Sequence, residues 1–65
     1  MIAEARLKAG MTQRDLAARV GVHKIKISQW ERGDRAPSSA NINKLAKALN
    51  LDAGAVYKWF HHATK

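Results

Sequence analysis

Four residues between positions 24 and 29 combine hydrogen-bonding side chains with one aliphatic side chain. Their spacing of i, i+1, i+4 and i+5 puts them on one face of a helix, and they are Lys24, Ile25, Ser28 and Gln29. Glutamine can pair bidentately with adenine, lysine can donate to O6 and N7 of guanine, and an exposed isoleucine can contact the thymine methyl group. We therefore hypothesise that Gln29 and Lys24 read bases directly and that Ile25 reads a thymine. The alternative is an ordinary solvated helix surface, so the surrounding elements must decide between the two.

The segment Thr12–Gly33, which contains these four residues, has the pattern of two short amphipathic helices joined by a glycine turn. The hydroxyl of Thr12 suits the start of the first helix, because it can accept a hydrogen bond from an unpaired amide there. Gly21 stands where the chain must bend sharply, since glycine enters left-handed backbone conformations without a side-chain clash, and Gly33 ends the second helix. The positions expected to face inward are Leu16, Ala17, Val20, Val22, Ile27 and Trp30. This layout is typical of a DNA-binding helix-turn-helix.

Apolar residues at helical spacing continue outside this segment, and no stretch alternates as a β-strand would. We expect helices at Ile2–Ala9, Thr12–Val20, about His23–Arg32, Ser38 or Ser39 to Leu49, and Ala53 to about Phe60. Gly10 ends the first of these helices, Asn50 can take the left-handed position that closes the fourth, and Asp52 caps the fifth. The sequence therefore predicts an all-α fold of five helices in a single domain over residues 1–65. Residues 12–33 would form its helix-turn-helix core, and residues 38–60 its fourth and fifth helices.

Length and composition exclude several other classes of protein. Sixty-five residues suffice for one small domain, 46% of them are hydrophobic, and none is cysteine. No apolar run approaches the roughly 20 residues that span a bilayer, so we expect a cytoplasmic protein without a membrane partner. Asp15 and Glu31 are isolated acids, and the histidines at positions 23, 61 and 62 share no metal-ligand spacing with an acid. With neither a glycine-rich phosphate loop nor a nucleophile elbow, we expect no enzymatic activity, no metal and no cofactor.

The chain carries a large excess of positive charge. Twelve Lys and Arg residues oppose five Asp and Glu residues, which gives a formal net charge of +7 at pH 7. Such an excess attracts nucleic acids, acidic proteins or anionic membranes, although a basic surface can also serve solubility alone. Combined with the helix-turn-helix pattern, the charge favours nucleic acid. Four basic residues are expected to neutralise DNA phosphates, with plain solvated charges as the alternative: Arg14, Lys26, Arg32 and Arg35.

Several motifs in register resemble those of the Cro/repressor-type (XRE-like) helix-turn-helix family of phage and bacterial transcription regulators. They are TQRDLA, RVGV, ISQWERG and a proline followed by a helix, and they extend from Ala5 to about Val56. The resemblance implies a compact five-helix, lambda-repressor-like domain whose third helix lies in the major groove of DNA. It also implies that the protein acts in a bacterial or phage-infected cell.

The resemblance further implies roles for individual residues. It implies contacts with base edges or nearby phosphates at His23, Lys24, Ile25, Ser28 and Gln29. It also implies phosphate contacts from Gln13, which braces the third helix as well, from Lys26, and from a second clamp formed by Arg35 and the amides of Ser39 and Ala40. The chain departs from the family pattern at His23, where many relatives have Ser, Thr or Asp, and at Ile25, where polar side chains are common. We therefore expect an operator preference of its own.

A structural role is expected for Arg6 and Glu31. Glu31 follows Trp30 on the inward edge of the predicted third helix, and a partly buried carboxylate needs a partner. A bidentate arginine would satisfy it and hold the third helix against the first. The resemblance implies the same pair.

The end of the chain carries three aromatic residues near the end of one short helix, more than a small core can bury. We expect four residues to serve partly the core and partly a two-fold contact between copies: Leu51, Val56, Trp59 and Phe60. In such a homodimer the two recognition helices would lie about 34 Å apart, one turn of DNA, on a near-palindromic site. Simple core packing is the alternative for Val56 and Phe60.

These observations predict a sequence-specific transcriptional regulator. We expect a Cro-like phage or prophage repressor that occupies an operator in double-stranded DNA as a homodimer and excludes polymerase, and an activating contact stays open. One alternative is the antitoxin of a toxin–antitoxin pair, which would repress its own operon and hold a toxin with its last helix. Another is a protein-interaction adaptor whose basic face docks an acidic protein. Salt-sensitive binding to random duplex, with tighter binding to one short site, would favour DNA.

Overall fold

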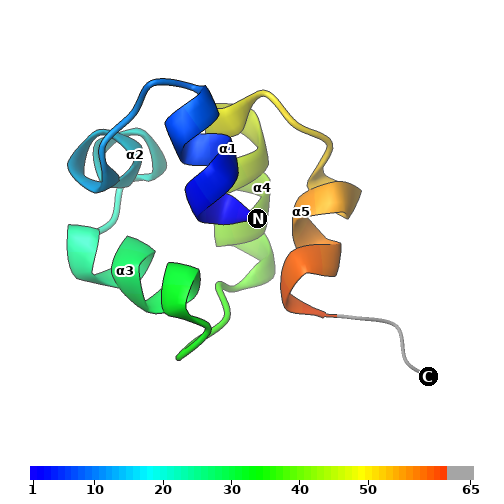
Figure 1. Cartoon of the computed structure of the whole chain (residues 1–65). Helices are drawn as coiled ribbons and strands as arrows, with labels where there is room; N and C mark the ends of the chain where they lie inside the picture. Colours follow the sequence, from blue (N-terminus) through cyan, green and yellow to red (C-terminus); the bar gives the residue numbers. More distant parts are fainter. Residues whose placement is uncertain (62–65) are drawn as a thin grey trace.

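The computed structural model describes residues 1–61, and residues 62–65, which the predicted domain includes, lie outside the described residues. The described part contains five α-helices and no β-strand (Figure 1). The helices are α1 (Ile2–Lys8), α2 (Gln13–Val20), α3 (Lys24–Arg32), α4 (Ser39–Leu49) and α5 (Ala53–Phe60). The predicted all-α class with five helices is confirmed. Thr12 and His23, expected as the first residues of two helices, are the cap residues that precede α2 and α3.

Side-chain caps define where the last four helices begin. The Thr12 hydroxyl accepts a hydrogen bond from the Asp15 amide at 3.0 Å, and the Asp15 carboxylate accepts one from the Thr12 amide at 2.9 Å. Ser38 and Asp52 likewise accept from the amide three residues later, at the starts of α4 and α5. Because each cap involves only neighbouring residues, these helix starts follow directly from the sequence.

A glycine turn joins α2 to α3. Gly21 has a φ of +84°, a left-handed conformation that strains any residue with a Cβ atom, and its amide donates to the Ala17 carbonyl at 2.8 Å. Helix α3 begins at Lys24, only three residues later, so the two helices must lie close together. The small side chain of Ala17 is 3% exposed, as expected for a residue in a tight helix contact. The turn therefore fixes how α3 is presented next to α2.

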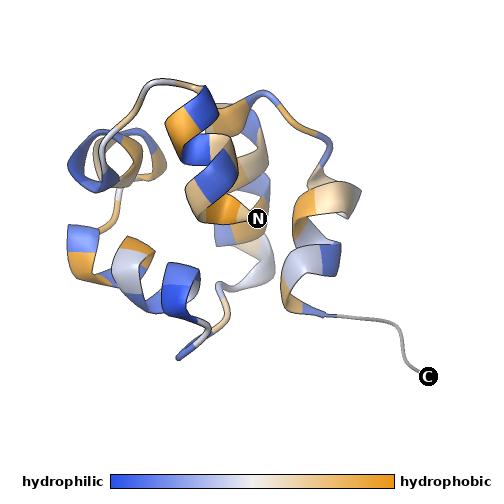
Figure 2. Cartoon of the chain, in the orientation of Figure 1, coloured by the Kyte–Doolittle hydropathy of each residue, from blue (hydrophilic) through white to orange (hydrophobic). Residues whose placement is uncertain are grey.

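Apolar side chains from all five helices meet in one core. The orange segments of the ribbon in Figure 2 show that each helix contributes hydrophobic residues. Helix α2 packs against α3 and α4, α4 packs against α5, and α1 packs against α3. The buried apolar residues are Ile2, Met11, Leu16, Ala17, Val20, Ile27, Trp30, Ile42, Leu45, Ala46, Leu49 and Val56. Val56 is fully buried, in agreement with simple core packing, the alternative kept for this residue, and its part in a two-fold contact stays a prediction.

Candidate nucleic-acid interface

Helix α3 has one side in the core and the other in solvent. Ile27 and Trp30 anchor it, with exposed fractions of 0% and 5%. The residues outside the core include Lys24, Ile25 and Lys26, which are exposed, and Ser28 and Gln29, which are half-buried. Ile25 stands out because 56% of an aliphatic side chain is exposed to water, which leaves an apolar surface for a partner. The structure thus brings the four predicted base-reading residues to the surface of a single helix.

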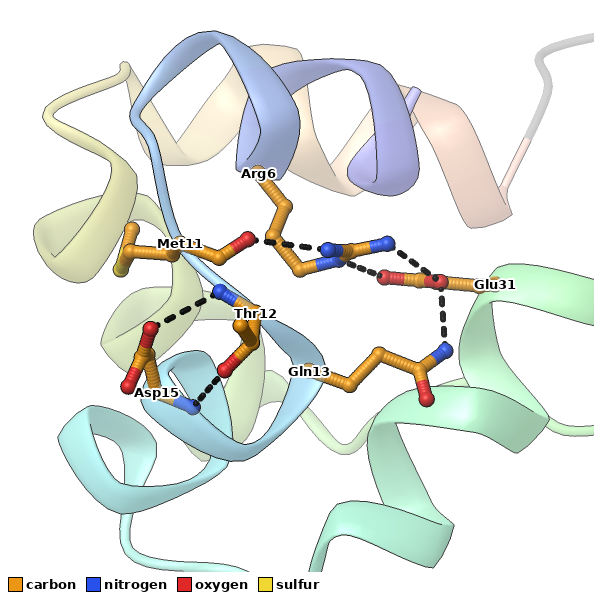
Figure 3. A network of polar contacts seen from close by, with 6 residues as sticks. All are labelled: Arg6, Met11, Thr12, Gln13, Asp15 and Glu31. Carbon is orange, nitrogen blue, oxygen red and sulfur yellow. Dashed lines mark hydrogen bonds and ion pairs between the residues drawn. The ribbon is translucent and has the colours of Figure 1, made fainter.

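A network of polar contacts centred on Glu31 holds α3 against the rest of the fold (Figure 3). Arg6 of α1 donates from Nε to Glu31 Oε2 at 2.7 Å and from Nη2 to Oε1 at 3.5 Å. The third guanidinium nitrogen, Nη1, donates to the Met11 carbonyl at 2.9 Å. The side chains of Arg6 and Glu31 are only 12% and 9% exposed, so water competes little for these bonds. The Arg6–Glu31 pair expected from the sequence forms, and it links α1, the α1–α2 loop and α3.

Gln13 is a third donor to the same carboxylate, a contact that the sequence reasoning missed. Its Nε2 donates to Glu31 Oε1 at 2.9 Å, from the first residue of α2 to the last turn of α3. An amide nitrogen has two hydrogens, so one remains for the phosphate contact that the resemblance implies for Gln13. A signal was present in the sequence, because a half-buried carboxylate has room for more than one donor. Gln13 therefore braces α3, and its phosphate contact stays a prediction.

His23 caps α3 with its ring. The Nδ1 atom accepts a hydrogen bond from the Ile25 amide at 3.1 Å, so in this geometry the ring proton lies on Nε2. The side chain is otherwise exposed, and its Nε2–H can donate outward. A concave surface lies beside it between α2 and the start of α3, lined by Arg14, Ala17, Ala18, Val22, His23 and Lys24. A lining that combines apolar side chains with basic ones suits the sugar-phosphate backbone of a nucleic acid.

The start of α4 presents backbone amides without a partner. The Ser38 hydroxyl accepts from the Asn41 amide at 3.2 Å, and the preceding amides of Ser39 and Ala40 have no partner among the described residues. Amides at the start of a helix bind anions well, because they point outward and the helix dipole favours negative charge. Ser39 and Ala40 are exposed, and so is Arg35 in the preceding loop. This arrangement is compatible with the phosphate clamp that the resemblance implies.

All five acidic residues have a donor close by. Their partners are the N-terminal ammonium for Glu4 at 2.6 Å, the Thr12 amide for Asp15, Arg6 for Glu31, Arg32 for Asp34 at 3.0 Å, and the Ala55 amide for Asp52. The hydrogen bonds from Thr12 lower the pKa of Asp15, and the terminal ammonium lowers that of Glu4. Arg32 thus has a carboxylate neighbour within the fold. In contrast, Lys24 and Lys26 form no ion pair with the described residues.

The remaining predicted contact residues lie on α5 and just before it. Leu51 is 40% exposed, and Trp59 and Phe60 are half-buried against the core. Trp59 and Phe60 line a cavity of about 160 Å³ together with Ile2 of α1 and Trp30 of α3. Of the four residues predicted to serve partly the core and partly a two-fold contact, Leu51, Trp59 and Phe60 retain exposed area, and the contact itself stays a prediction.

No helix among residues 1–61 combines the length and the apolar character needed to cross a membrane. No group of three or more His, Cys, Asp or Glu side chains within the same range could hold a metal ion. His62 lies outside the described residues.

A family profile described as Helix-turn-helix matches residues 2–56 of the chain. Among similar proteins, the HTH-type transcriptional regulator DicA of Escherichia coli is 45% identical over 38 residues, which cover 58% of this chain and 28% of DicA. Repressor protein C2 of Salmonella phage P22 is 42% identical over 53 residues, 82% of this chain and 24% of that protein. An uncharacterized HTH-type transcriptional regulator of Methanothermobacter thermautotrophicus is 41% identical over 52 residues, 80% of this chain and 75% of the other.

The chain therefore spans less than a third of the first two relatives and about three quarters of the third. All three carry names of regulators or repressors, which agrees with the prediction that this chain is not an enzyme.

Proposed function

This chain belongs to the helix-turn-helix family, and on that basis we propose that it is a DNA-binding transcriptional regulator. In this proposal α3 enters the major groove of a double-stranded operator and reads base edges. The amides and basic side chains at the starts of α2 and α4 bind the flanking phosphates. The names of the relatives, which include a phage repressor, support repression as the effect on transcription.

One observation carries the proposal: the inner side of α3 is fixed by buried contacts, whereas the exposed side chains on its outer side pack against no other part of the described fold. Glu31 accepts hydrogen bonds from two other helices, and Ile27 and Trp30 are buried. The exposed side combines the charge of Lys24 with the apolar side chain of Ile25. A structural helix would gain nothing from such an exposed combination, whereas the major groove offers both acceptors and thymine methyl groups.

We further propose that two copies bind a near-palindromic site. The support is the apolar area left exposed on α5 and just before it, where Leu51 is 40% exposed and Trp59 and Phe60 are only partly buried. In Figure 1, α5 lies on the opposite side of the molecule from the start of α3. Two-fold symmetry would place the second α3 one DNA turn away, about 34 Å. Sedimentation of the protein with its selected site tests this, because a 1:1 complex on the full site would contradict it.

Selection of bound duplexes from a random pool tests DNA binding itself. We expect one short sequence to be enriched and bound about 10³-fold or more tightly than random duplex, with affinity falling as salt rises. Lys24→Gln should lower the affinity for the selected site. Lys47→Gln is the matched control, because it removes the same charge from an exposed position in the second half of α4. A pool without enrichment, or equal losses in the two variants, would contradict the proposal.

A further inference from the structure

Gln29 holds its two amide atoms in different surroundings. Its carbonyl oxygen, Oε1, is the one side-chain polar atom among the described residues that is buried without a hydrogen-bond partner. Its nitrogen, Nε2, makes no hydrogen bond within residues 1–61 and is not buried in that way. Gln29 is half-buried as a whole, and of its two amide atoms the nitrogen is the one that solvent or a partner can reach.

The orientation of this amide follows from the cost of the alternative. Turning the amide over would bury an NH2 group with two unpaired hydrogens in place of one oxygen. Burying two unpaired donors costs more than burying one acceptor, so the oxygen stays inside. As α3 is held in the fold, Gln29 therefore presents donors to a partner and no acceptor.

The other residues on the exposed side of α3 supply the same kind of group. Lys24 has only donor hydrogens, and the Ser28 hydroxyl can donate as well as accept. The acidic residue of this helix, Glu31, points inward, and its carboxylate accepts hydrogen bonds from Arg6 and Gln13. All the other acids have partners elsewhere in the fold. No carboxylate among the described residues is thus available to accept from a base on this surface.

We propose that α3 reads DNA by donating, so that it recognises the acceptor groups of its operator: O6 and N7 of guanine and O4 of thymine, with Ile25 on a thymine methyl group. The inference rests on the proposed function and specifies its chemistry. It replaces the bidentate pairing of Gln29 with adenine that the sequence suggested, because that pairing needs an exposed carbonyl oxygen. The amino groups of adenine and cytosine, which are donors, find no acceptor on Lys24 or on the exposed end of Gln29, and on this side of α3 only the Ser28 hydroxyl could accept from them.

Base analogues in the selected operator distinguish acceptor reading from amino-group reading with the wild-type protein. Every base pair offers both kinds of group, so single atoms have to be removed. The replacements 7-deazaguanine and 5-methyl-2-pyrimidinone remove guanine N7 and thymine O4, whereas purine and 2-pyrimidinone remove the amino groups of adenine and cytosine. The same replacements at pairs outside the enriched sequence measure the effect of weakened base pairing.

We expect removal of an acceptor to weaken binding about tenfold at one or more pairs, and removal of an amino group to change binding less than about twofold at every pair. A tenfold loss on removing an amino group at a pair whose preference depends on residue 29 would overturn the inference and leave the proposed function standing. A pool that yields no enriched sequence would refute the proposed function, and this inference with it.

Two variants of Gln29 give an independent test on the protein side. Gln29→Lys keeps a donor and Gln29→Glu keeps only acceptors, so donor reading predicts that the lysine variant retains the wild-type base preference and the glutamate variant loses it. The base preference is measured as the ratio of two affinities, one for the selected site and one for a site changed at the base pair whose preference depends on residue 29. This ratio cancels the general effect of charge. Loss of preference in both folded variants would overturn the inference. If either variant fails to fold, the analogue experiment with the wild-type protein decides.

Discussion

Replacing Arg6 with methionine removes the guanidinium that faces Glu31 but keeps most of the apolar stem. In the folded protein the Glu31 carboxylate would then lie at 9% exposure with Gln13 as its one remaining side-chain donor. Removing one partner of a buried ion pair costs about 3–5 kcal/mol, since the other charge is left without compensation. The pair here is slightly exposed and Gln13 remains, so we expect a loss of about 2–3 kcal/mol in the free energy of unfolding.

That loss is large for a chain of this size. Stabilities of roughly 0.05–0.15 kcal/mol per residue give about 3–10 kcal/mol for 65 residues. Urea denaturation followed by circular dichroism measures the change in unfolding free energy directly. A double-mutant cycle with Glu31→Gln then isolates the pair. We expect a coupling energy of at least about 1.5 kcal/mol between the two positions.

The matched control is Arg19→Met, which removes an exposed guanidinium in the last turn of α2. It should cost less than about 0.5 kcal/mol. Additive effects of Arg6→Met and Glu31→Gln within about 0.5 kcal/mol would show that the contacts in Figure 3 do not act as a unit. Glu31 would then not hold α3 against α1 through Arg6.

Four further predictions concern single sites. His23→Ala should lower the unfolding free energy by about 1 kcal/mol through loss of the α3 cap, and His23→Asn should recover most of it; equal losses in urea melts would argue against the cap. Gly21→Ala should cost about 1–2 kcal/mol because of its positive φ, and an unchanged melting temperature would contradict this. Because its pKa is lowered, the Asp15 carboxylate contributes fully to the free energy of unfolding above the unfolded pKa near 3.8, and this contribution is lost as pH falls through the folded pKa. Asp15→Asn should therefore flatten the pH dependence of the unfolding free energy over that acidic range. An unaltered pH dependence would refute the role of the bond between Asp15 and Thr12. Val56→Ala should cost about 1–3 kcal/mol, whereas Leu51→Ala should cost less than half as much, and the reverse order would contradict the burial of the two side chains.

The parts of the fold that depend on neighbouring residues could be predicted from the sequence. The cap at Thr12, the turn at Gly21 and the left-handed end of α4 at Asn50 each need only a few adjacent residues and a backbone preference. Helical spacing likewise predicted Ile27 and Trp30 on the inner side of α3.

The features that were missed depend on where separate elements lie in space. The contact from Gln13 to Glu31 joins residues 18 positions apart; the resemblance implied a phosphate contact and a bracing role for Gln13, and Glu31 was paired with Arg6 alone. The burial of the Gln29 oxygen depends on how α3 sits on its neighbours, which helical spacing does not describe. Val56 is expected from the sequence to serve partly the core and partly a contact between copies, and how completely the core buries it is visible only in the structure. Spacing predicts which face a residue is on, and packing decides how deep it lies.

The central claim is that the outer side of α3 enters the major groove, and nuclear magnetic resonance on the complex with the selected duplex tests it most directly. Intermolecular contacts between the Ile25 side chain and a thymine methyl group, with the largest amide shifts at Lys24, Ile25 and Ser28, are the expected result. The claim would be contradicted if those signals stayed unchanged while residues of α5 such as Tyr57, which is 48% exposed, shifted on addition of DNA.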